Sequence, residues 1–253
     1  MIKSTVTEKR AYFPRGLYQP EGSFRFSADA LLLAAFILRH CLPHTPRPRV
    51  MLELGCGCGV ISLACLLADK ELTSLGVDIV PELAAAANTN AAALGLAARF
   101  SAVVADATAP AAQNFSPERY GVLAANPPYY TLGKGRLPRS AMRRKAFFAD
   151  EKMLPGFIQS AAHALAPGGR FALIYPWEAR QVLLEELASA GFFPAVTLPL
   201  YTAGVEPSRI LYAAARGNTD MVEPVLLPPI RLHPGGVGAY TAEALSFCPW
   251  LVS

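Results

Sequence analysis

The sequence predicts an α/β fold in which a seven-stranded, mostly parallel sheet ends in a C-terminal antiparallel hairpin. From about residue 49 onward, short β-branched or apolar runs alternate with longer helical runs, which is the pattern of βαβ units. The last two extended runs follow each other closely, as the strands of a hairpin do. The 253 residues, 53% of them hydrophobic, are enough to bury one large core.

The elements can be placed in order along the chain. Strands are expected at 50–54, 73–79, 100–106, 121–126, 170–176, 195–201 and 209–215. Helices are expected at 28–41, 60–69, 81–94, 153–166 and 178–190. Pro81 stands in the first turn of its helix, where its missing N–H is harmless, and Gly168-Gly169 is expected to end the helix before the fifth strand.

We expect a single domain over residues 1–253, built from three parts. Residues 1–48 form an N-terminal helical segment, residues 49–216 form the core, and residues 217–253, rich in Pro and Gly, form a wrapping tail. No apolar run reaches the roughly 20 residues that a membrane-spanning helix needs. The N-terminus lacks the pattern of a signal peptide, so a cytoplasmic location is expected.

The five cysteines and four histidines have no metal-ligand spacing, so the sequence predicts reduced thiols and no metal site. The net charge of +4 permits a nucleic-acid partner without requiring one. The oligomeric state is left open by the sequence.

A glycine-rich turn joins the first strand to the next helix. Met51-Leu-Glu-Leu-Gly-Cys-Gly-Cys-Gly59 places Glu53 near the end of the strand and then Gly55, Gly57 and Gly59 at every second position. Glycine tolerates positive φ and has no Cβ, so such a backbone can approach a ligand closely. Taken alone, the turn could equally be a tight connection without a ligand.

Two further carboxylates follow the next strands at the same edge of the predicted sheet. Asp78, followed by Ile79, stands where a doubly wound sheet presents a carboxylate to two ribose hydroxyls. Asp106, followed by Ala107, lies within reach of an adenine amino group. Carboxylates at three consecutive strand ends favour one shared nucleoside ligand over three unrelated loop residues.

The spacing of the glycines distinguishes between nucleoside cofactors. A dinucleotide loop of the form G-x-G-x-x-G is absent, because Val60 and Ser62 stand where its last glycine would lie, and this argues against a nicotinamide-dependent dehydrogenase. The arrangement Glu-x-Gly-x-Gly-x-Gly resembles motif I of class I S-adenosylmethionine-dependent methyltransferases. That resemblance implies S-adenosyl-L-methionine as cofactor and a Rossmann-like class I methyltransferase fold.

Asn126-Pro127-Pro128-Tyr129 follows the fourth strand and resembles the N-P-P-Y signature of methyltransferases that act on planar nitrogens. The lone pair of such a nitrogen is delocalised. The Asn126 side-chain oxygen and the Pro127 carbonyl can accept its two N–H hydrogens and stabilise the positive charge that develops on alkylation. The two prolines stiffen this segment, and Tyr129 offers a ring on which a flipped base or amide plane can stack.

A basic segment without acidic residues follows at 133–149. Its cationic residues are Lys134, Arg136, Arg139, Arg143, Arg144 and Lys145. Such a segment can bind the phosphates of a nucleic acid and position it over the site, although a solvated charged face is the ordinary alternative.

Over nearly its whole length the chain resembles the bacterial tRNA1(Val) (adenine-N6)-methyltransferase family. The stretches that carry this resemblance are 18–33, 164–169, 208–211 and 232–241. The resemblance implies that Asp29 helps to close the cofactor pocket, and that the substrate is N6 of an adenine next to a tRNA anticodon.

Other substrates and functions remain open. Relatives with the same tetrapeptide methylate a glutamine side-chain amide of a translation release factor or the guanine N2 of ribosomal RNA. A nucleotide-binding module without catalysis is a further alternative, and the complete tetrapeptide argues against it.

Overall fold

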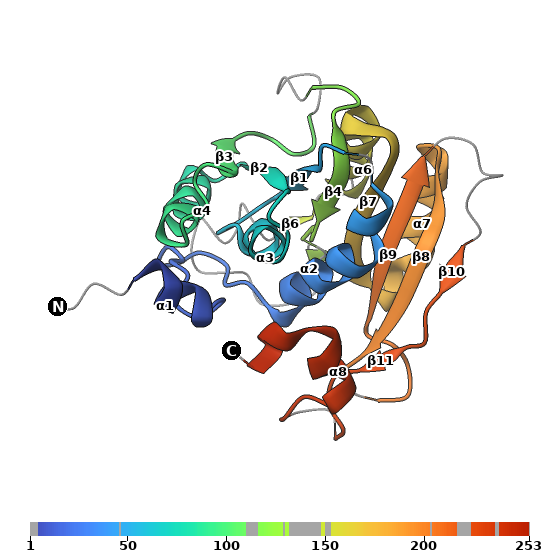
Figure 1. Ribbon diagram of the computed structural model, residues 1–253. Coiled ribbons are helices and arrows are strands. Elements are labelled where there is room, and N and C mark those ends of the chain that lie inside the picture. The colour runs from blue at the N-terminus through green and yellow to red at the C-terminus, as the bar shows by residue number, and fades with distance from the viewer. Residues whose placement is uncertain are drawn as a thin grey trace.

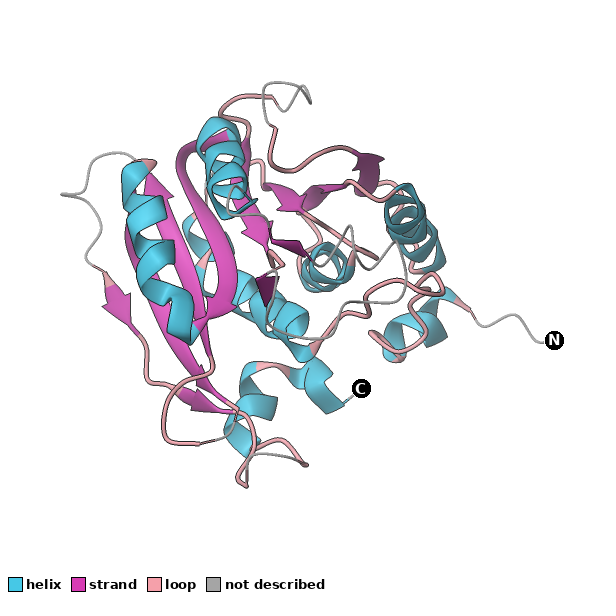
Figure 2. Ribbon diagram, turned by 180° about the vertical axis from the view of Figure 1, so that it is seen from behind, coloured by secondary structure: helices cyan, strands magenta, loops and turns pink. Residues whose placement is uncertain are grey.

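The computed structural model describes most of the chain, with gaps. The described residues are 5–45, 47–109, 116–128, 130–131, 148–149, 153–202, 204–216, 224–235 and 238–252. They form three layers, in which one central sheet lies between two layers of helices (Figures 1 and 2).

The central sheet has nine strands in the order β10-β8-β9-β7-β4-β1-β2-β3, and β11 also pairs with β8. The strands are β1 (Val50–Leu54), β2 (Thr73–Asp78), β3 (Phe100–Val104), β4 (Tyr120–Ala125), β7 (Leu165–Pro176), β8 (Phe192–Tyr201), β9 (Arg209–Arg216), β10 (Val225–Leu226) and β11 (Ile230–Arg231). Strand β9 runs antiparallel to both β7 and β8, whereas the other pairings are parallel.

The predicted fold class is confirmed, because all seven expected strands form one mostly parallel sheet with β8 and β9 as its antiparallel hairpin. The tail adds the two short strands β10 and β11, which the sequence does not predict. A separate pair of two-residue strands, β5 (Tyr130–Thr131) and β6 (Phe148–Ala149), lies outside this sheet.

The helices are close to those expected. They are α1 (Val6–Ala11), α2 (Ala28–His40), α3 (Val60–Ala68), α4 (Pro81–Ala93), α6 (Met153–Ala164), α7 (Arg180–Ser189) and α8 (Ala242–Phe247), with the 3-10 turns η1 (Leu42–His44), η3 (Trp177–Ala179) and η5 (Pro249–Val252). Helix α1 is not among the predicted helices, although Thr5 and Glu8 form a complete capping box that marks its start. None of the helices in the described part of the chain is long and apolar enough to cross a membrane.

The glycine pair Gly168-Gly169 corrects one prediction. Helix α6 ends at Ala164, and the pair lies four residues later inside the long strand β7. A Cβ on Gly169 would stand only 2.8 Å from the carbonyl oxygen of Gly121 in β4, so glycine permits close pairing of the two strands. The irregular register of β4 and β7 begins at the same place.

Two apolar clusters fill the space on either side of the sheet. The first packs α2, α3 and α4 against one face, and the second packs α6 and α7 against the other. Helix α2 is buried continuously from Ala30 to Ile37, on all its sides. A helix that is apolar all round must be covered all round. Helix α3, the sheet and the turn η5 of the tail all pack against α2, and the Arg39 side chain donates to the carbonyls of Ser246 and Phe247 in the tail.

Candidate active site

The carboxyl ends of β1, β2 and β4 meet at one edge of the sheet and border a cleft of about 460 Å³. Ligand sites in open α/β sheets lie at this edge. Eleven of the residues predicted for cofactor binding and catalysis line the cleft: Asp29, Glu53, Gly55, Gly57, Asp78, Ile79, Asp106, Ala107, Asn126, Pro127 and Pro128.

The three glycines of the turn have different roles. All three have positive φ, of +71° at Gly55, +55° at Gly57 and +86° at Gly59. A Cβ at Gly57 would meet no atom within 4 Å, so this residue faces open space in the cleft. Gly59 is the N-cap of α3 and does not line the cleft, and a Cβ there would stand 3.1 Å from the Cβ of Ala87. Gly59 therefore serves the packing of α3 on α4.

Glu53 lies at the floor of the cleft and is only 1% exposed. Its Oε2 accepts hydrogen bonds from the backbone N and the Oγ of Ser62, at 2.9 and 2.5 Å. Burial raises the pKa of Glu53 to about 8, and the hydrogen bonds from Ser62 offset part of that rise. The first turn of α3 thus holds a carboxyl group that carries a proton near neutral pH.

Asp78 joins the end of β2 to the glycine turn. Its Oδ2 accepts from the Gly57 N–H at 2.8 Å, and its Oδ1 accepts from the Val80 N–H at 2.9 Å. Burial raises the pKa of Asp78, and these two backbone hydrogen bonds act in the opposite direction. Because each carboxylate oxygen has two lone pairs, both oxygens can still accept from hydroxyl groups of a ligand.

The third carboxylate, Asp106, is held by hydrogen bonds from Thr108. Its Oδ1 accepts from the backbone N and the Oγ1 of Thr108, at 2.8 and 2.7 Å. The Ala107 carbonyl accepts from Ser160 of α6 at 2.6 Å, which fixes this segment to the helical layer. On the other side, Ile79 is 50% exposed and gives the cleft an apolar surface beside Asp78.

The segment predicted to be catalytic follows β4. Pro127 is buried, Asn126 and Pro128 are half-buried, and all three line the cleft. The structure therefore brings the predicted catalytic residues and the predicted cofactor residues to one cavity. The remaining candidates lie outside the described residues: Tyr129, Lys134, Arg136, Arg139, Arg143, Arg144 and Lys145.

The segment that leads into α2 and the first turn of α2 form one wall of the cleft. Asp29 lies in this wall, at the place where the family resemblance implies that it helps to close the cofactor pocket. Asp29 pairs with Arg209 of β9, with Oδ2 3.1 Å from Nε. Phe24, Phe26 and Arg209 also line the cleft. These three are not predicted from the sequence, because single aromatic residues in a loop and an arginine 180 positions after Asp29 give no local signal.

A side-chain amide fastens the N-terminal segment to the core. Asn90 of α4 accepts from the Tyr18 N–H at 2.7 Å and donates to the Tyr18 carbonyl at 3.0 Å. It also donates to the Cys58 carbonyl in the glycine turn at 3.0 Å. One buried residue thus sets the position of the turn and of the segment opposite it.

The cysteines of the glycine turn have no sign of metal or redox chemistry. All five cysteines are free and buried, and burial raises the pKa of the Cys58 thiol to about 12. Such thiols stay protonated and unreactive. Within the described stretches, no three His, Cys, Asp or Glu side chains are grouped as metal ligands.

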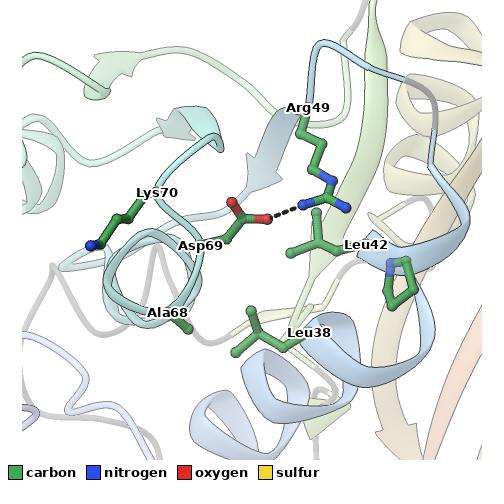
Figure 3. Close-up of a pocket in the computed structure, with 7 residues that line it drawn as sticks. Leu38, Leu42, Arg49, Ala68, Asp69 and Lys70 are labelled. Carbon is green, nitrogen blue, oxygen red and sulfur yellow. Dashed lines mark hydrogen bonds and ion pairs between the residues drawn. The ribbon is translucent and has the colours of Figure 1, made fainter.

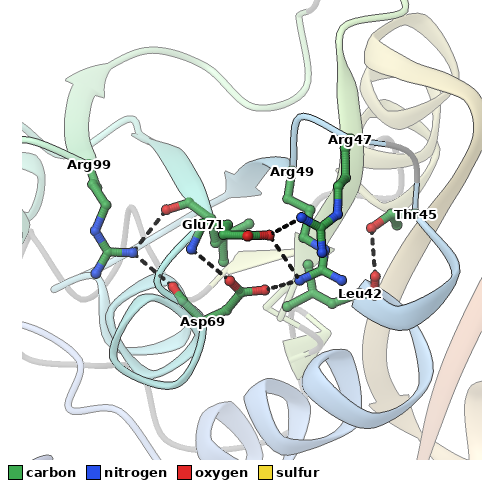
Figure 4. Close-up of polar contacts among 8 residues, drawn as sticks. Leu42, Thr45, Arg47, Arg49, Asp69, Glu71 and Arg99 are labelled. Atoms are coloured by element: carbon green, nitrogen blue, oxygen red, sulfur yellow. Dashed lines mark hydrogen bonds and ion pairs between the residues drawn. The ribbon is translucent and has the colours of Figure 1, made fainter.

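A second cleft, of about 340 Å³, lies at the opposite edge of the sheet (Figure 3). Leu38, Leu42 and Pro43 form its apolar side, and Arg49 points across it to Asp69, with Nη1 and Oδ2 2.7 Å apart. Of the predicted site residues that the structure describes, none lines this cleft. Figure 4 shows why the cleft is polar on one side.

The polar side of the second cleft is a network of arginines and carboxylates. Arg47 pairs with Glu71 at 2.5 Å, and Arg49 lies between Asp69 and Glu71 (Figure 4). Arg99 donates to the carbonyls of Leu66, Asp69 and Leu72 at the end of α3. The network thus satisfies backbone carbonyls at and just after the C-terminal end of α3.

Comparison with known proteins identifies relatives. Residues 21–189 match the model of the family described as the methyltransferase small domain. The chain is 27% identical over 229 residues to the tRNA1(Val) (adenine(37)-N6)-methyltransferase of Porphyromonas gingivalis, and the alignment covers 87% of this chain and 86% of that protein. It is 30% identical over 157 residues to the release factor glutamine methyltransferase of Salmonella typhimurium, covering 56% of this chain and 52% of that protein.

Among solved structures, the chain is similar to a crystal structure described as a predicted O-methyltransferase from Agrobacterium tumefaciens. The TM-score is 0.67 at 19% identity, and the match covers 88% of this chain and 96% of the other. At this identity the likeness shows the fold alone.

Proposed function

Because this chain belongs to the methyltransferase small domain family, we propose that it transfers a methyl group from S-adenosylmethionine to N6 of an adenine in tRNA. The observation that carries the proposal is the meeting of Asp78, Glu53 and the Asn126-Pro127-Pro128 segment in one cleft. Such an activity belongs to the cytoplasm, where its substrate and cofactor are.

The cleft fits S-adenosylmethionine in size and chemistry. Its volume of about 460 Å³ is within the range of small-molecule sites. Asp78 would accept hydrogen bonds from the two ribose hydroxyls. The exposed face of Ile79 would contact the adenine ring, and Asp106 would accept a hydrogen bond from the adenine amino group. Gly57, with open space where its Cβ would lie, lets the backbone pass close beneath the ligand.

Glu53 would face the amino-acid part of the cofactor. The protonated carboxyl group of Glu53 has hydrogen-bond partners but no cationic side chain beside it in the described residues. An ammonium group is the ligand that stabilises its ionised form, because an opposite charge nearby lowers the pKa of a carboxyl group. The carboxyl group then releases its proton when the cofactor binds.

The bound cofactor would supply a methyl group on a sulfonium centre. The Asn126 side-chain oxygen and the Pro127 carbonyl would accept the two amino hydrogens of the adenine and orient its nitrogen toward that methyl group. These acceptors also stabilise the positive charge that develops on the nitrogen, which then releases one proton. The buried position of Pro127 keeps its carbonyl fixed in place.

The substrate choice rests on two observations. The alignment with the tRNA adenine methyltransferase extends over 87% of this chain, against 56% for the release factor methyltransferase. The basic residues between 133 and 149 suit phosphate binding, which a protein amide substrate does not require.

Transfer of radiolabelled methyl groups from S-adenosylmethionine tests the proposal. Unmodified tRNA, ribosomal RNA and a release factor serve as parallel acceptors, followed by nucleoside and amino-acid analysis. We expect the label as N6-methyladenosine from tRNA. Label found only in the release factor or in ribosomal RNA would leave the enzyme class standing and refute the substrate.

A further inference from the structure

The strands beside the catalytic segment extend farther than the strand that carries it. Ala125, the last residue of β4, is in register with Leu173, while β7 continues to Pro176. At about 3.3 Å per residue, the turn after β7 stands roughly 10 Å beyond the level of Asn126. In Figure 1 the hairpin of β8 and β9 likewise reaches past the end of β4. This extension forms a wall beside the cleft.

The top of this wall is held together by backbone hydrogen bonds. The Trp177 N–H donates to the Ser208 carbonyl at 3.1 Å, and the Ser208 N–H donates to the Leu200 carbonyl at 2.7 Å. The Leu232 N–H then donates to the Tyr201 carbonyl at 2.7 Å. Three neighbouring strand ends and the turn after β7 therefore form one rigid unit.

Two pairs of an arginine and an aromatic ring stand on this unit. The guanidinium of Arg180 lies 4.2 Å from the centre of the Trp177 ring, and that of Arg231 lies 5.0 Å from the centre of the Tyr201 ring. Both distances are within the range of cation–π contacts. We call these four residues the cation–aromatic wall.

Both pairs lie on the same side of the sheet. Trp177 packs against the cluster of α6 and α7. Leu200 and the two neighbours of Arg231 in the chain belong to the opposite cluster, so strand alternation places Tyr201 and Arg231 on the α6–α7 side with Trp177. Since β7 and β11 are three strands apart, the wall is about 14 Å long at the usual strand spacing.

The arginines retain donors for a partner. Arg180 donates to the Trp177 carbonyl, and Arg231 donates to the Gly204 carbonyl. A guanidinium has five N–H donors, and in the described part of the chain no ion pair engages either one. Glu178 and Glu206 are exposed nearby, so the wall is not a strong field of positive charge. It offers flat surfaces and directed donors instead.

The charge of the described residues agrees with the absence of a strong positive field at the wall. The described residues contain 15 lysines and arginines and 15 aspartates and glutamates, so the net charge of +4 lies wholly in the rest of the chain. Attraction of a polyanion therefore depends on segments such as 133–149. The wall itself offers aromatic rings and guanidinium planes, which are surfaces to which unstacked bases bind.

A protein strand fits this place less well. Peptide strands bind by pairing with an open sheet edge. Here the outer edge of β8 is already paired with β10 at Val196 and Thr197 and with β11 at Leu200 and Tyr201.

We propose that the cation–aromatic wall of Trp177, Arg180, Tyr201 and Arg231 binds the single-stranded RNA beside the target adenine. The inference rests on the proposed function, because it concerns the same substrate. Bases next to the target stack on the two pairs, and the free guanidinium donors contact the neighbouring phosphates. The wall then positions the strand from which the target base enters the cleft.

Binding of unmodified tRNA over a range of salt concentrations, together with methyl transfer, tests this inference. For Arg180→Ala and Arg231→Ala we expect a KM for tRNA that is raised about fivefold or more and an unchanged kcat. The slope of the logarithm of the binding constant against the logarithm of the salt concentration should become less steep by about one. Tyr201→Leu should weaken binding, and Tyr201→Phe should restore it. The affinity for S-adenosylmethionine and the Tm, measured for each variant, report a folding defect.

Arg119→Ala is the matched control. Arg119 also lies over a ring, that of Tyr120 at 5.9 Å, but at the opposite edge of the sheet. If Arg180→Ala and Arg231→Ala bind tRNA as Arg119→Ala does, the wall has no role in RNA binding. A parent enzyme that methylates only a release factor would instead overturn the proposed function together with this inference, and that result is seen before any variant is compared.

Discussion

Both edges of the sheet contain carboxylates, which are half-buried or exposed at the amino edge and buried in the case of Glu53 and Asp78 at the carboxyl edge. At the amino edge, Asp69 pairs with Arg49 at 2.7 Å. At the carboxyl edge, Glu53 and Asp78 accept hydrogen bonds only from backbone N–H groups and a hydroxyl in the described structure. A carboxylate with its own cation is complete as it stands. One without a cation is stabilised further by a ligand that brings hydroxyl or ammonium groups.

The two clefts differ in the same way in the residues that border them. The cleft at the amino edge is bordered by ion pairs between arginines and carboxylates and by aliphatic side chains. The cleft at the carboxyl edge contains Glu53 and Asp78, carboxyl groups without a cation in the described part of the chain, and the glycine turn. Four substitutions test this difference.

The largest effect is expected for Asn126→Ala. It removes the proposed acceptor of the substrate nitrogen, and loss of one such group typically lowers kcat by about 100-fold or more. S-adenosylmethionine should bind with nearly unchanged affinity, since Asn126 is not expected to hold the ribose. Single-turnover methyl transfer and calorimetric titration measure the two effects, and a variant with the kcat of the parent would remove Asn126 from the catalytic role.

Asp78→Asn should act mainly on the cofactor. It replaces one of the two oxygens that would accept from the ribose, and we expect the Kd for S-adenosylmethionine to rise about tenfold, as for the loss of a hydrogen bond to a charged group. Glu82→Gln, an exposed carboxylate in the first turn of α4, is the control. Equal Kd values for both variants would contradict the assignment of Asp78.

Asp69→Asn tests the amino edge. It leaves Arg49, whose side chain is 21% exposed, without its closest carboxylate, and we expect a loss of about 1–3 kcal/mol in the free energy of unfolding. The affinity for S-adenosylmethionine should not change. Glu71→Gln, at the more exposed pair with Arg47, should cost about 1 kcal/mol or less by the same urea titration. A Kd altered by Asp69→Asn would show that the two edges are coupled.

A further effect is expected in the pH dependence of stability. The pKa of Glu53 is raised from 4.5 to about 8 by burial. Between these values the folded protein holds a proton that the unfolded chain releases, so stability falls as the pH rises through this window. The raised pKa of Asp78 adds a slope of the same sign. Glu53→Gln should remove the Glu53 part, so that its Tm relative to the parent is higher at pH 8.5 than at pH 5.

A constant difference in Tm between the Glu53→Gln variant and the parent across this range would mean that the Glu53 carboxyl group titrates alike in the folded and unfolded protein.

The sequence predicts the carboxyl edge well because its signals are local. Glu53, Asp78, Asp106 and Asn126 each stand at the end of an apolar run, and parallel strands bring their carboxyl ends to one edge. The sequence does not predict the partner of Asp29, because Arg209 comes from a distant strand. Contacts of this kind depend on the order of strands in the sheet rather than on residue type.

The glycines show the same limit. The sequence assigns Gly59 to the cofactor and Gly169 to a helix end. The structure adds a packing role for Gly59 beside Ala87, and it places Gly169 inside β7, close to Gly121. A glycine that permits a close approach between two elements has the same local signature as one in a turn. Its neighbour in space decides the difference.

The packing of the tail on α2 affects when the cleft can form. The helix that carries Asp29 and closes the cleft is buried partly by α8 and η5, near the other end of the described chain. During synthesis on the ribosome, α2 emerges before residues 242–252 and keeps part of its apolar surface open until they follow. The cleft of a nascent chain is therefore unfinished until these residues have docked on α2.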